Sequence, residues 1–190
     1  MITVTPLENL GYFKNDWLEA RHHFSFADYL DPDRMGLGVL RVWNDDTIQS
    51  GGEFPTHPHR DMEIITFLRH GAITHEDNLG NRGVTVAGNV QVMSAGTGIM
   101  HSEANLEDDI TTLFQIWIIP AERNITPRWE TREFPGDSRS GHLHTLASGR
   151  SVDEGALKIF QDAAVMGATL SPGEEIVHGL TDGRQAYLVP

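Results

Sequence analysis

HPHRDMEI, at residues 57–64, is the stretch of this sequence that decides the fold. In an extended strand, residues two apart point to the same face of the sheet. Pro58 favours an extended conformation for the residue before it. We therefore expect a strand that turns the imidazoles of His57 and His59 to one side.

A second pair with the same spacing lies further along the chain, at His101 and Glu103. On facing strands the two pairs would present three imidazoles and one carboxylate to a common point. Such donors suit a divalent iron, copper, nickel or zinc ion and can leave positions free for water, dioxygen or a chelating substrate. Glu63 is an alternative carboxylate, because it lies four residues after His59 and shares its face if the strand is unbroken.

The composition excludes several classes of protein. The 190 residues carry a formal net charge of −13 and include no cysteine. Disulfides, thiolate metal ligands and cysteine nucleophiles are therefore excluded, and the acidic balance disfavours contact with nucleic-acid phosphates. The apolar runs are too short to span a membrane, and the first residues do not resemble a signal peptide. We expect a cytoplasmic protein with no nucleic-acid or membrane partner.

Most of the chain has the pattern of short β-strands. Apolar stretches at 37–43, 62–68 and 111–119, separated by glycine, asparagine and aspartate, predict an all-β sandwich or barrel. The turn-forming residues 44–46 are expected to end the first of these strands. Residues 16–21 carry a weak helical signal and are expected to form one helical turn.

The remaining histidines are assigned structural roles. His22 and His23 precede aromatic residues and are expected to pack among them. His75 comes just before residues 78–83, whose composition is typical of a hairpin tip. We therefore expect His75 at a solvated strand end.

Six stretches of the sequence carry a resemblance to a known family. They are HPHRDMEI (57–64), HEDNLGNRG (75–83), QVMSAGTGIMHSE (91–103), HFSFADY (23–29), LRVWNDD (40–46) and QIWIIP (115–120). Together they resemble the cupins, and more specifically the pirin family, whose first segment reads HPHRGxE[TI]. The resemblance is strong over residues 17–127 and weaker beyond them.

The resemblance implies a fold. Pirins are bicupins, so we expect an all-β cupin sandwich or barrel, with a metal-binding cupin at 1–132 and a short or incomplete cupin-like region at 133–190. Residues 185–189 are expected to form a strand of this second region. At 190 residues the chain looks too short for two complete cupins.

The resemblance also implies a set of ligands. Carried over to this sequence, it assigns one divalent transition metal to His57, His59, His101 and Glu103, and it favours Glu103 over Glu63. Iron(II) is the first expectation, with nickel, manganese, cobalt, copper and zinc as alternatives, because the same donors accept several metals.

Two functions follow from the resemblance. Some pirins resemble quercetinases, oxidoreductases that cleave a flavonol such as quercetin with dioxygen and release carbon monoxide. In such an enzyme Glu103 would be the catalytic base that takes the proton of the substrate hydroxyl. Other pirins resemble metal-dependent transcriptional co-regulators, so a non-enzymatic role with a protein partner is the alternative. The sequence leaves the oligomeric state open.

Overall fold

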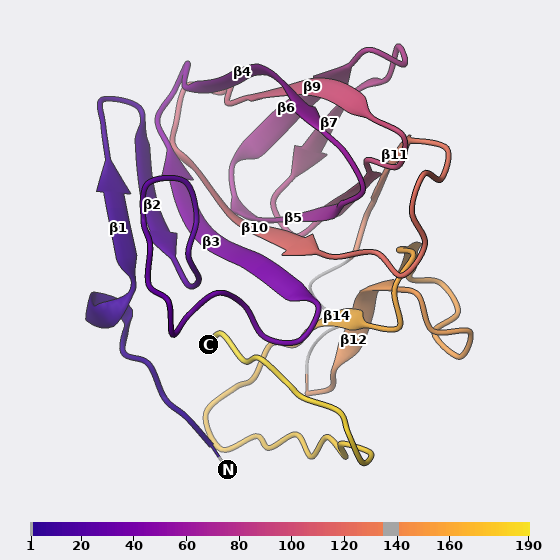
Figure 1. The fold of residues 1–190 in the computed structure, drawn as a ribbon. Helices are drawn as coiled ribbons and strands as arrows, with labels where there is room; N and C mark the ends of the chain where they lie inside the picture. The colour runs from indigo at the N-terminus through magenta and orange to yellow at the C-terminus, as the bar shows by residue number, and fades with distance from the viewer. Residues whose placement is uncertain (1, 135–140) are drawn as a thin grey trace.

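The structure, a computed structural model, describes residues 2–134 and 141–190 and is almost entirely β (Figure 1). Its elements are the 3-10 helix η1 (Leu7–Asn9) and the strands β1 (Gly11–Lys14), β2 (Leu18–His22), β3 (Leu40–Ile48), β4 (Glu53–His59), β5 (Glu63–His70), β6 (Ala72–Asp77), β7 (Arg82–Val86), β8 (Val90–Ser94), β9 (Ile99–Ala104), β10 (Thr111–Ile118), β11 (Arg128–Arg132), β12 (His144–Ser148), β13 (Leu157–Lys158) and β14 (Ala164–Gly167). The part of the chain that the structure describes contains no helix long and apolar enough to cross a membrane.

The strands form two facing antiparallel sheets and a third, smaller one. The larger sheet has the order β1-β2-β3-β10-β5-β8-β11, and the four-stranded sheet has the order β4-β9-β6-β7. The small sheet, β13-β12-β14, lies to one side of both (Figure 1). The expected all-β sandwich is confirmed.

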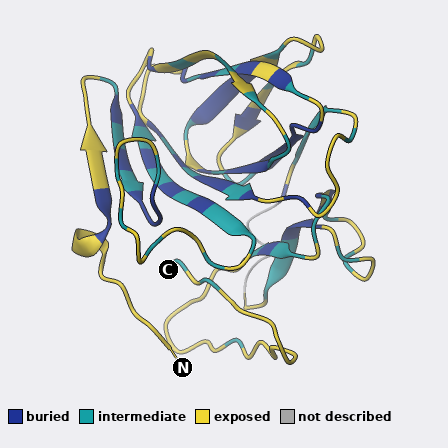
Figure 2. Ribbon diagram, in the orientation of Figure 1, coloured by how far each residue is buried: buried dark blue, intermediate teal, exposed yellow. Residues whose placement is uncertain are grey.

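Alternate residues of the strands fill the space between the two facing sheets. In β5, Ile64 and Leu68 point into this space and belong to two clusters of buried side chains. Ile64 packs in one cluster with Ile99 of β9, and Leu68 packs in the other with Ile73 of β6. Burial is therefore concentrated on the inner strands, as Figure 2 shows.

The residues from 141 onward cover the opposite face of the larger sheet. Ile65 and Ile116 point to that face and pack in one cluster with Leu146, Leu157 and Ile159. Each of these five side chains is at most 2% exposed. The two parts of the chain therefore share one apolar core.

The expected division of the chain at 132/133 falls beside residues 135–140, which lie outside the described residues. The division therefore stays a prediction. What the structure adds is that β11 ends at Arg132 while still paired with β8.

The expected turn at 44–46 is wrong, because β3 continues through it to Ile48. Asn44 and Asp46 point into the space between the sheets and are both 3% exposed. The Nδ1 atom of His22 donates a hydrogen bond to Asn44 Oδ1 at 3.0 Å. These turn-forming residue types are thus polar groups of the interior, where hydrogen bonding to other strands replaces the local turn.

The expected helical turn at 16–21 is also wrong. Residues from Leu18 onward form β2, whose buried and half-buried residues alternate. Leu18 and Ala20 fill the core together with Leu68. Burial at a period of two has overridden the weak helical propensity of this segment.

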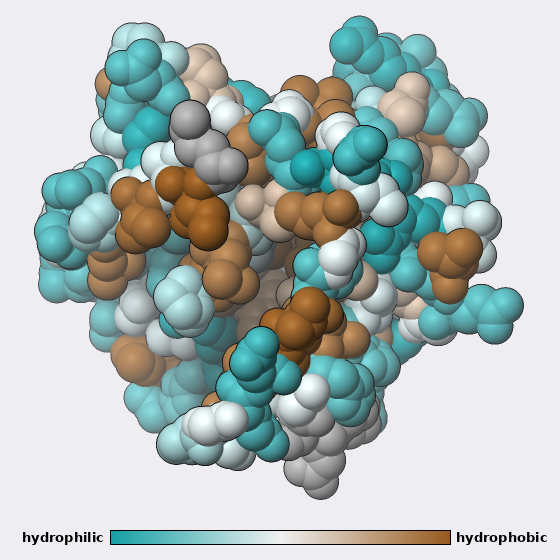
Figure 3. Space-filling model, turned by 90° about the horizontal axis from the view of Figure 1, so that it is seen from below, coloured by the Kyte–Doolittle hydropathy of each residue, from teal (hydrophilic) through white to brown (hydrophobic). Residues whose placement is uncertain are grey.

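The expected strand at 185–189 is absent, and residues 170–190 form a segment with turns at 172–173 and 182–183 that doubles back beneath the sheets (Figure 1). Seen from below, this side of the molecule is a mixture of polar and apolar groups around a hollow (Figure 3). Tyr187 anchors the segment, because its hydroxyl lies 2.8 Å from His23 Nδ1 and its ring contacts Phe24 and Trp43. The expected packing of His23 among aromatic rings is confirmed.

The shared core predicts that the whole chain unfolds as one unit. Ile65→Ala and Leu157→Ala should each lower the free energy of unfolding by about 2–5 kcal/mol, because each leaves a cavity in a closed core. Urea denaturation should show a single transition for both variants. Val177→Ala is the control, since this side chain is 86% exposed and its loss should change stability by less than about 0.5 kcal/mol. Two separate transitions would contradict the shared core.

Candidate metal centre

The pairing of β4 with β9 brings the three predicted histidines together. In their antiparallel register His57 lies directly opposite His101, and His59 lies opposite Ile99. The ring centroids of His57, His59 and His101 are between 4.5 and 5.0 Å apart. One nitrogen from each ring lies within 4.8 Å of the other two.

The nitrogens of this cluster fit a shared metal ion. His57 Nδ1 lies 2.8 Å from the carbonyl oxygen of Pro55. A carbonyl only accepts, so Nδ1 carries the proton and Nε2 keeps a free lone pair. That Nε2 lies 3.1 Å from His101 Nε2. Two nitrogens bound at right angles to one ion, each at about 2.1 Å, are about 3.0 Å apart.

Burial favours the neutral, metal-binding form of these imidazoles. It lowers the pKa of His59 to about 4, with the neighbouring His57 as a further cause. Burial also lowers the pKa of His101, and the other two rings add to the effect. His101 is 2% exposed, whereas His57 and His59 are partly exposed. The cluster is therefore open to solvent on the β4 side.

Glu103 lies on the same face of β9 as His101, and hydrogen bonds fix its carboxylate. Gln91 Nε2 donates to its Oε1 at 2.6 Å, and Gln115 Nε2 donates to its Oε2 at 2.9 Å. Burial raises the pKa of Glu103 to about 7, against the opposing effect of these hydrogen bonds. With His75 and His101, Glu103 forms a second group whose ligand atoms lie within 4.8 Å of one another.

The two glutamine amides have little freedom to turn. Thr66 Oγ1 donates to Gln115 Oε1 at 3.1 Å. Gln91 Oε1 accepts from Thr85 Oγ1 at 3.0 Å and from Trp129 Nε1 at 3.3 Å. Because donors occupy both carbonyl oxygens, both amide nitrogens must face the carboxylate. The interior of the sandwich thus holds this carboxylate in one position.

Glu63, the alternative carboxylate, does not join the histidines. Asp61 has a left-handed backbone (φ 46°) between β4 and β5, so the period of two does not run from His59 to Glu63. Glu63 accepts a hydrogen bond from Ser94 Oγ at 2.8 Å. Burial raises the pKa of its carboxyl, and Ser94 and the backbone of Phe160, in the second part of the chain, oppose that effect. It therefore faces the other side of the larger sheet. The alternative depended on an unbroken strand, and the backbone at Asp61 interrupts the strand.

His75 is the residue that sequence reasoning missed. The sequence predicts a solvated strand end, but His75 is 0% exposed within β6. Its Nδ1 lies 3.3 Å from His101 Nδ1, and its Nε2 lies 3.1 Å from Asp77 Oδ2. Its ring stacks on Trp129, with centroids 4.8 Å apart and planes at 7°. The sequence does hold one signal for burial: His75 lies two residues after the apolar Ile73 and so shares its face of the strand. The turn-forming residues that follow His75 obscure this signal.

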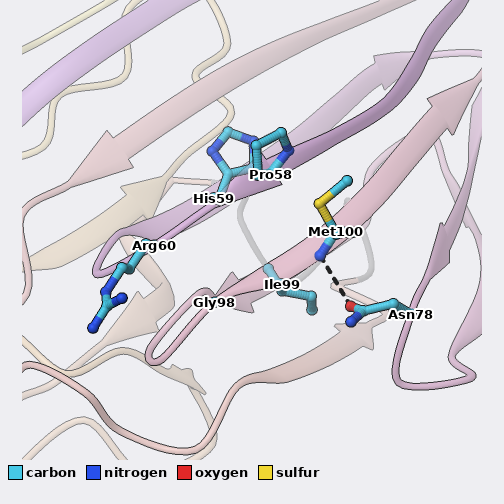
Figure 4. A pocket seen from close by; sticks show the side chains of 7 residues that line it. All are labelled: Pro58, His59, Arg60, Asn78, Gly98, Ile99 and Met100. Carbon is cyan, nitrogen blue, oxygen red and sulfur yellow. Dashed lines mark hydrogen bonds between the residues drawn. The ribbon is translucent and has the colours of Figure 1, made fainter.

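A depression of about 410 Å³ lies beside His59, where β4 ends (Figure 4). Pro58 and Met100, which alternate with the histidines along β4 and β9, contribute to its wall. The backbone N–H of Met100 donates to Asn78 Oδ1 at 2.9 Å and so ties the rim to the hairpin tip. His59 borders both this depression and the histidine cluster.

Two facing antiparallel sheets, with a histidine and carboxylate cluster between them, define the cupin class. Within it, the chain belongs to the pirin family. A family model described as Pirin matches residues 4–118, and one described as Quercetinase C-terminal cupin domain matches residues 145–189. The expected family and fold are confirmed.

Relatives of known name are similar over nearly the whole chain. A pirin-like protein of Caulobacter vibrioides is 56% identical over 190 residues, which is 100% of this chain and 82% of that protein. The quercetin 2,3-dioxygenase of Escherichia coli is 42% identical over 189 residues, 99% of this chain and 80% of that enzyme. The crystal structure of the Escherichia coli pirin YhhW in complex with nickel(II) has 43% identity and a TM-score of 0.78, covering 84% of this chain and 68% of that one.

Asp46 gives the interior a pH dependence that can be tested. Its Oδ1 has no hydrogen-bond partner among the described residues, and burial raises its pKa to about 8, with the charges of Asp45 and Glu103 adding to the effect. The folded chain therefore keeps this proton up to about pH 8, whereas the unfolded chain releases it near pH 4. Between these values the folded state binds more protons, so stability falls as the pH rises.

Asp46→Asn should remove this part of the pH dependence. In urea denaturation at pH 5 and pH 8, the variant should gain stability relative to the wild type at the higher pH, because amides do not ionise. A stability difference that is the same at both pH values would show that Asp46 is ionised in the folded protein.

Proposed function

We propose that this chain is a metal-dependent dioxygenase that cleaves a flavonol such as quercetin and releases carbon monoxide. The observation that carries the proposal is the approach of the Nε2 atoms of His57 and His101 to 3.1 Å, together with a buried carboxylate, Glu103, that lies within 4.8 Å of a ring nitrogen of His101 and is held by two glutamine amides. The names of several relatives support the same class of reaction.

The proposed ligands are His57, His59, His101 and Glu103. Iron(II) is the first choice of metal, and nickel is supported by the complex of the Escherichia coli relative. A divalent ion held there would act as a Lewis acid, lowering the pKa of a substrate hydroxyl and holding the substrate in place.

The chain's own residues would divide the remaining tasks. Glu103 takes the proton of the flavonol hydroxyl, and the two glutamine amides keep its oxygens in position to receive it. Trp117 packs edge-on against the His59 ring, with centroids 4.9 Å apart, and so restrains that imidazole. The partly exposed side of the cluster, at His57 and His59, admits an aromatic substrate and dioxygen.

Metal content tests the ligands. The wild-type chain should bind about one transition-metal ion, and His101→Ala should bind much less. Glu103→Gln and Glu63→Gln form a matched pair, since each removes one buried carboxylate charge. Only Glu103→Gln should lower the metal content measured by plasma mass spectrometry. An equal loss in both variants, or an unchanged His101→Ala, would rule out this assignment.

Turnover tests the reaction. The chain, loaded in turn with iron, nickel, manganese, cobalt or copper, should consume quercetin in air, seen as loss of the flavonol absorption band together with release of carbon monoxide. Glu103→Gln should lower the rate by about 100-fold or more, because a positioned base contributes at least that factor. Absence of turnover with every metal would contradict the enzyme proposal and favour a metal-dependent role with a protein partner.

A further inference from the structure

Asp77, His75 and His101 form a buried line of hydrogen-bonding groups that ends at the histidine cluster. The distances along it are 3.1 Å from Asp77 Oδ2 to His75 Nε2 and 3.3 Å from His75 Nδ1 to His101 Nδ1. The side chains of Asp77 and His75 are both 0% exposed, and His101 is 2% exposed. Of these three residues only His101, as a proposed ligand, has a role in the proposed reaction; Asp77 and His75 have none.

The position of each proton in the line follows from the carboxylate. An ionised carboxylate only accepts, so His75 Nε2 must carry a proton. A neutral His75 then has a bare Nδ1, which accepts from His101 Nδ1–H. A neutral His101 with its proton on Nδ1 has a bare Nε2, and this is the atom that lies 3.1 Å from His57 Nε2.

We propose that His75 is a positioning residue that fixes His101 in the tautomer whose bare Nε2 faces the metal position, with Asp77 setting the direction of the hydrogen bonds. This inference rests on the proposed metal centre. A carboxylate or carbonyl that accepts from the second nitrogen of a ligating histidine is a common device for the same purpose. Here an imidazole is inserted between the carboxylate and the ligand.

The surroundings hold His75 in one orientation. Trp129 covers its ring in a nearly parallel stack, and a side chain at position 83, which is glycine, would collide with that indole. Asp77 is fixed in turn, because its Oδ1 accepts the backbone N–H groups of Leu79 and Asn81 at 2.9 and 3.0 Å. Both Asp77, at the start of the line, and His75, in its middle, are therefore held in one orientation.

Asp77→Asn should reverse the direction of each hydrogen bond in the line, so that each imidazole carries its proton on the other nitrogen. The two backbone N–H groups would keep the new amide oxygen at the position of Oδ1, so the amide NH₂ would face His75. The Asn81 side-chain amide, whose Nδ2 donates to Oδ2 at 2.8 Å in the wild type, would turn to present its oxygen to this NH₂. His75 Nε2 would then accept, its Nδ1 would donate to His101, and the His101 proton would move to Nε2. A protonated Nε2 has no lone pair for a metal.

The matched control is Glu76→Gln. It removes the same charge from the adjacent position of β6, but its side chain is 54% exposed and pairs with Arg82 on the outside. Two quantities should be measured for the full chain: the protonated nitrogen of His101 in the metal-free protein, by two-bond ¹H–¹⁵N NMR, and the affinity for nickel(II), by competition with a chelator.

We expect His101 Nδ1–H in the wild type and in Glu76→Gln, and Nε2–H in Asp77→Asn with an affinity for nickel lower by about 10–100-fold. A wild-type His101 protonated on Nε2 would overturn the inference, as would an Asp77→Asn affinity equal to that of Glu76→Gln. If Asp77→Asn does not fold, the wild-type tautomer still decides.

Further outcomes separate this inference from the metal centre. Retention of nickel by His101→Ala would refute the metal centre, whatever the tautomer. Loss of nickel in His101→Ala combined with unchanged binding in Asp77→Asn would refute only the role of the line. Binding of two nickel ions per wild-type chain, reduced to one by His75→Phe, would make His75 a ligand and so also overturn its positioning role.

Discussion

The antiparallel register of β4 and β9 is the constraint on which the candidate site depends. It sets His57 opposite His101, and a slip of one residue would turn the imidazoles of one strand to the outside. Pro58 keeps β4 extended between its two histidines, and the hydrogen bond from Met100 to Asn78 ties β9 to the neighbouring hairpin. The pairing of the two backbones thus determines where the imidazoles meet.

The interior beside this position is polar, which is costly unless every group is paired. Two sets of hydrogen bonds meet that requirement for most of these groups: the glutamine amides on Glu103 and the line from Asp77 to His101; Asp46 Oδ1 is an exception. Trp129 joins them, because its ring stacks on His75 while its Nε1 donates to Gln91. A change at this indole would therefore disturb the carboxylate and an imidazole together. The same polar interior explains why burial shifts so many pKa values here.

Prediction from the sequence works where side-chain direction follows from the alternation of residues along a strand. It fails where the strand is interrupted, or where turn-forming residue types hide the alternation. His57 and His101 lie opposite each other on neighbouring strands of one sheet, because strand geometry alone sets their direction. Glu63 stayed open as an alternative carboxylate, because a left-handed residue between two strands is not visible as such in the sequence. Asn44 is a turn-forming residue type, yet it lies in a strand, where its amide oxygen accepts a hydrogen bond from His22 on the neighbouring strand. His75 was missed because its partners are His101 and Trp129 on other strands and Asp77 at the end of its own strand.

The central claim is that β4 and β9 hold one metal ion through three imidazoles, with the carboxylate of Glu103 beside them. The X-ray absorption spectrum of the chain loaded with one equivalent of nickel(II) tests it most directly. The account predicts the multiple-scattering pattern of three imidazoles at about 2.1 Å, reduced to two in His57→Ala, and loss of an oxygen ligand in Glu103→Gln. A spectrum without imidazole scattering, or one that neither variant changes, would contradict it.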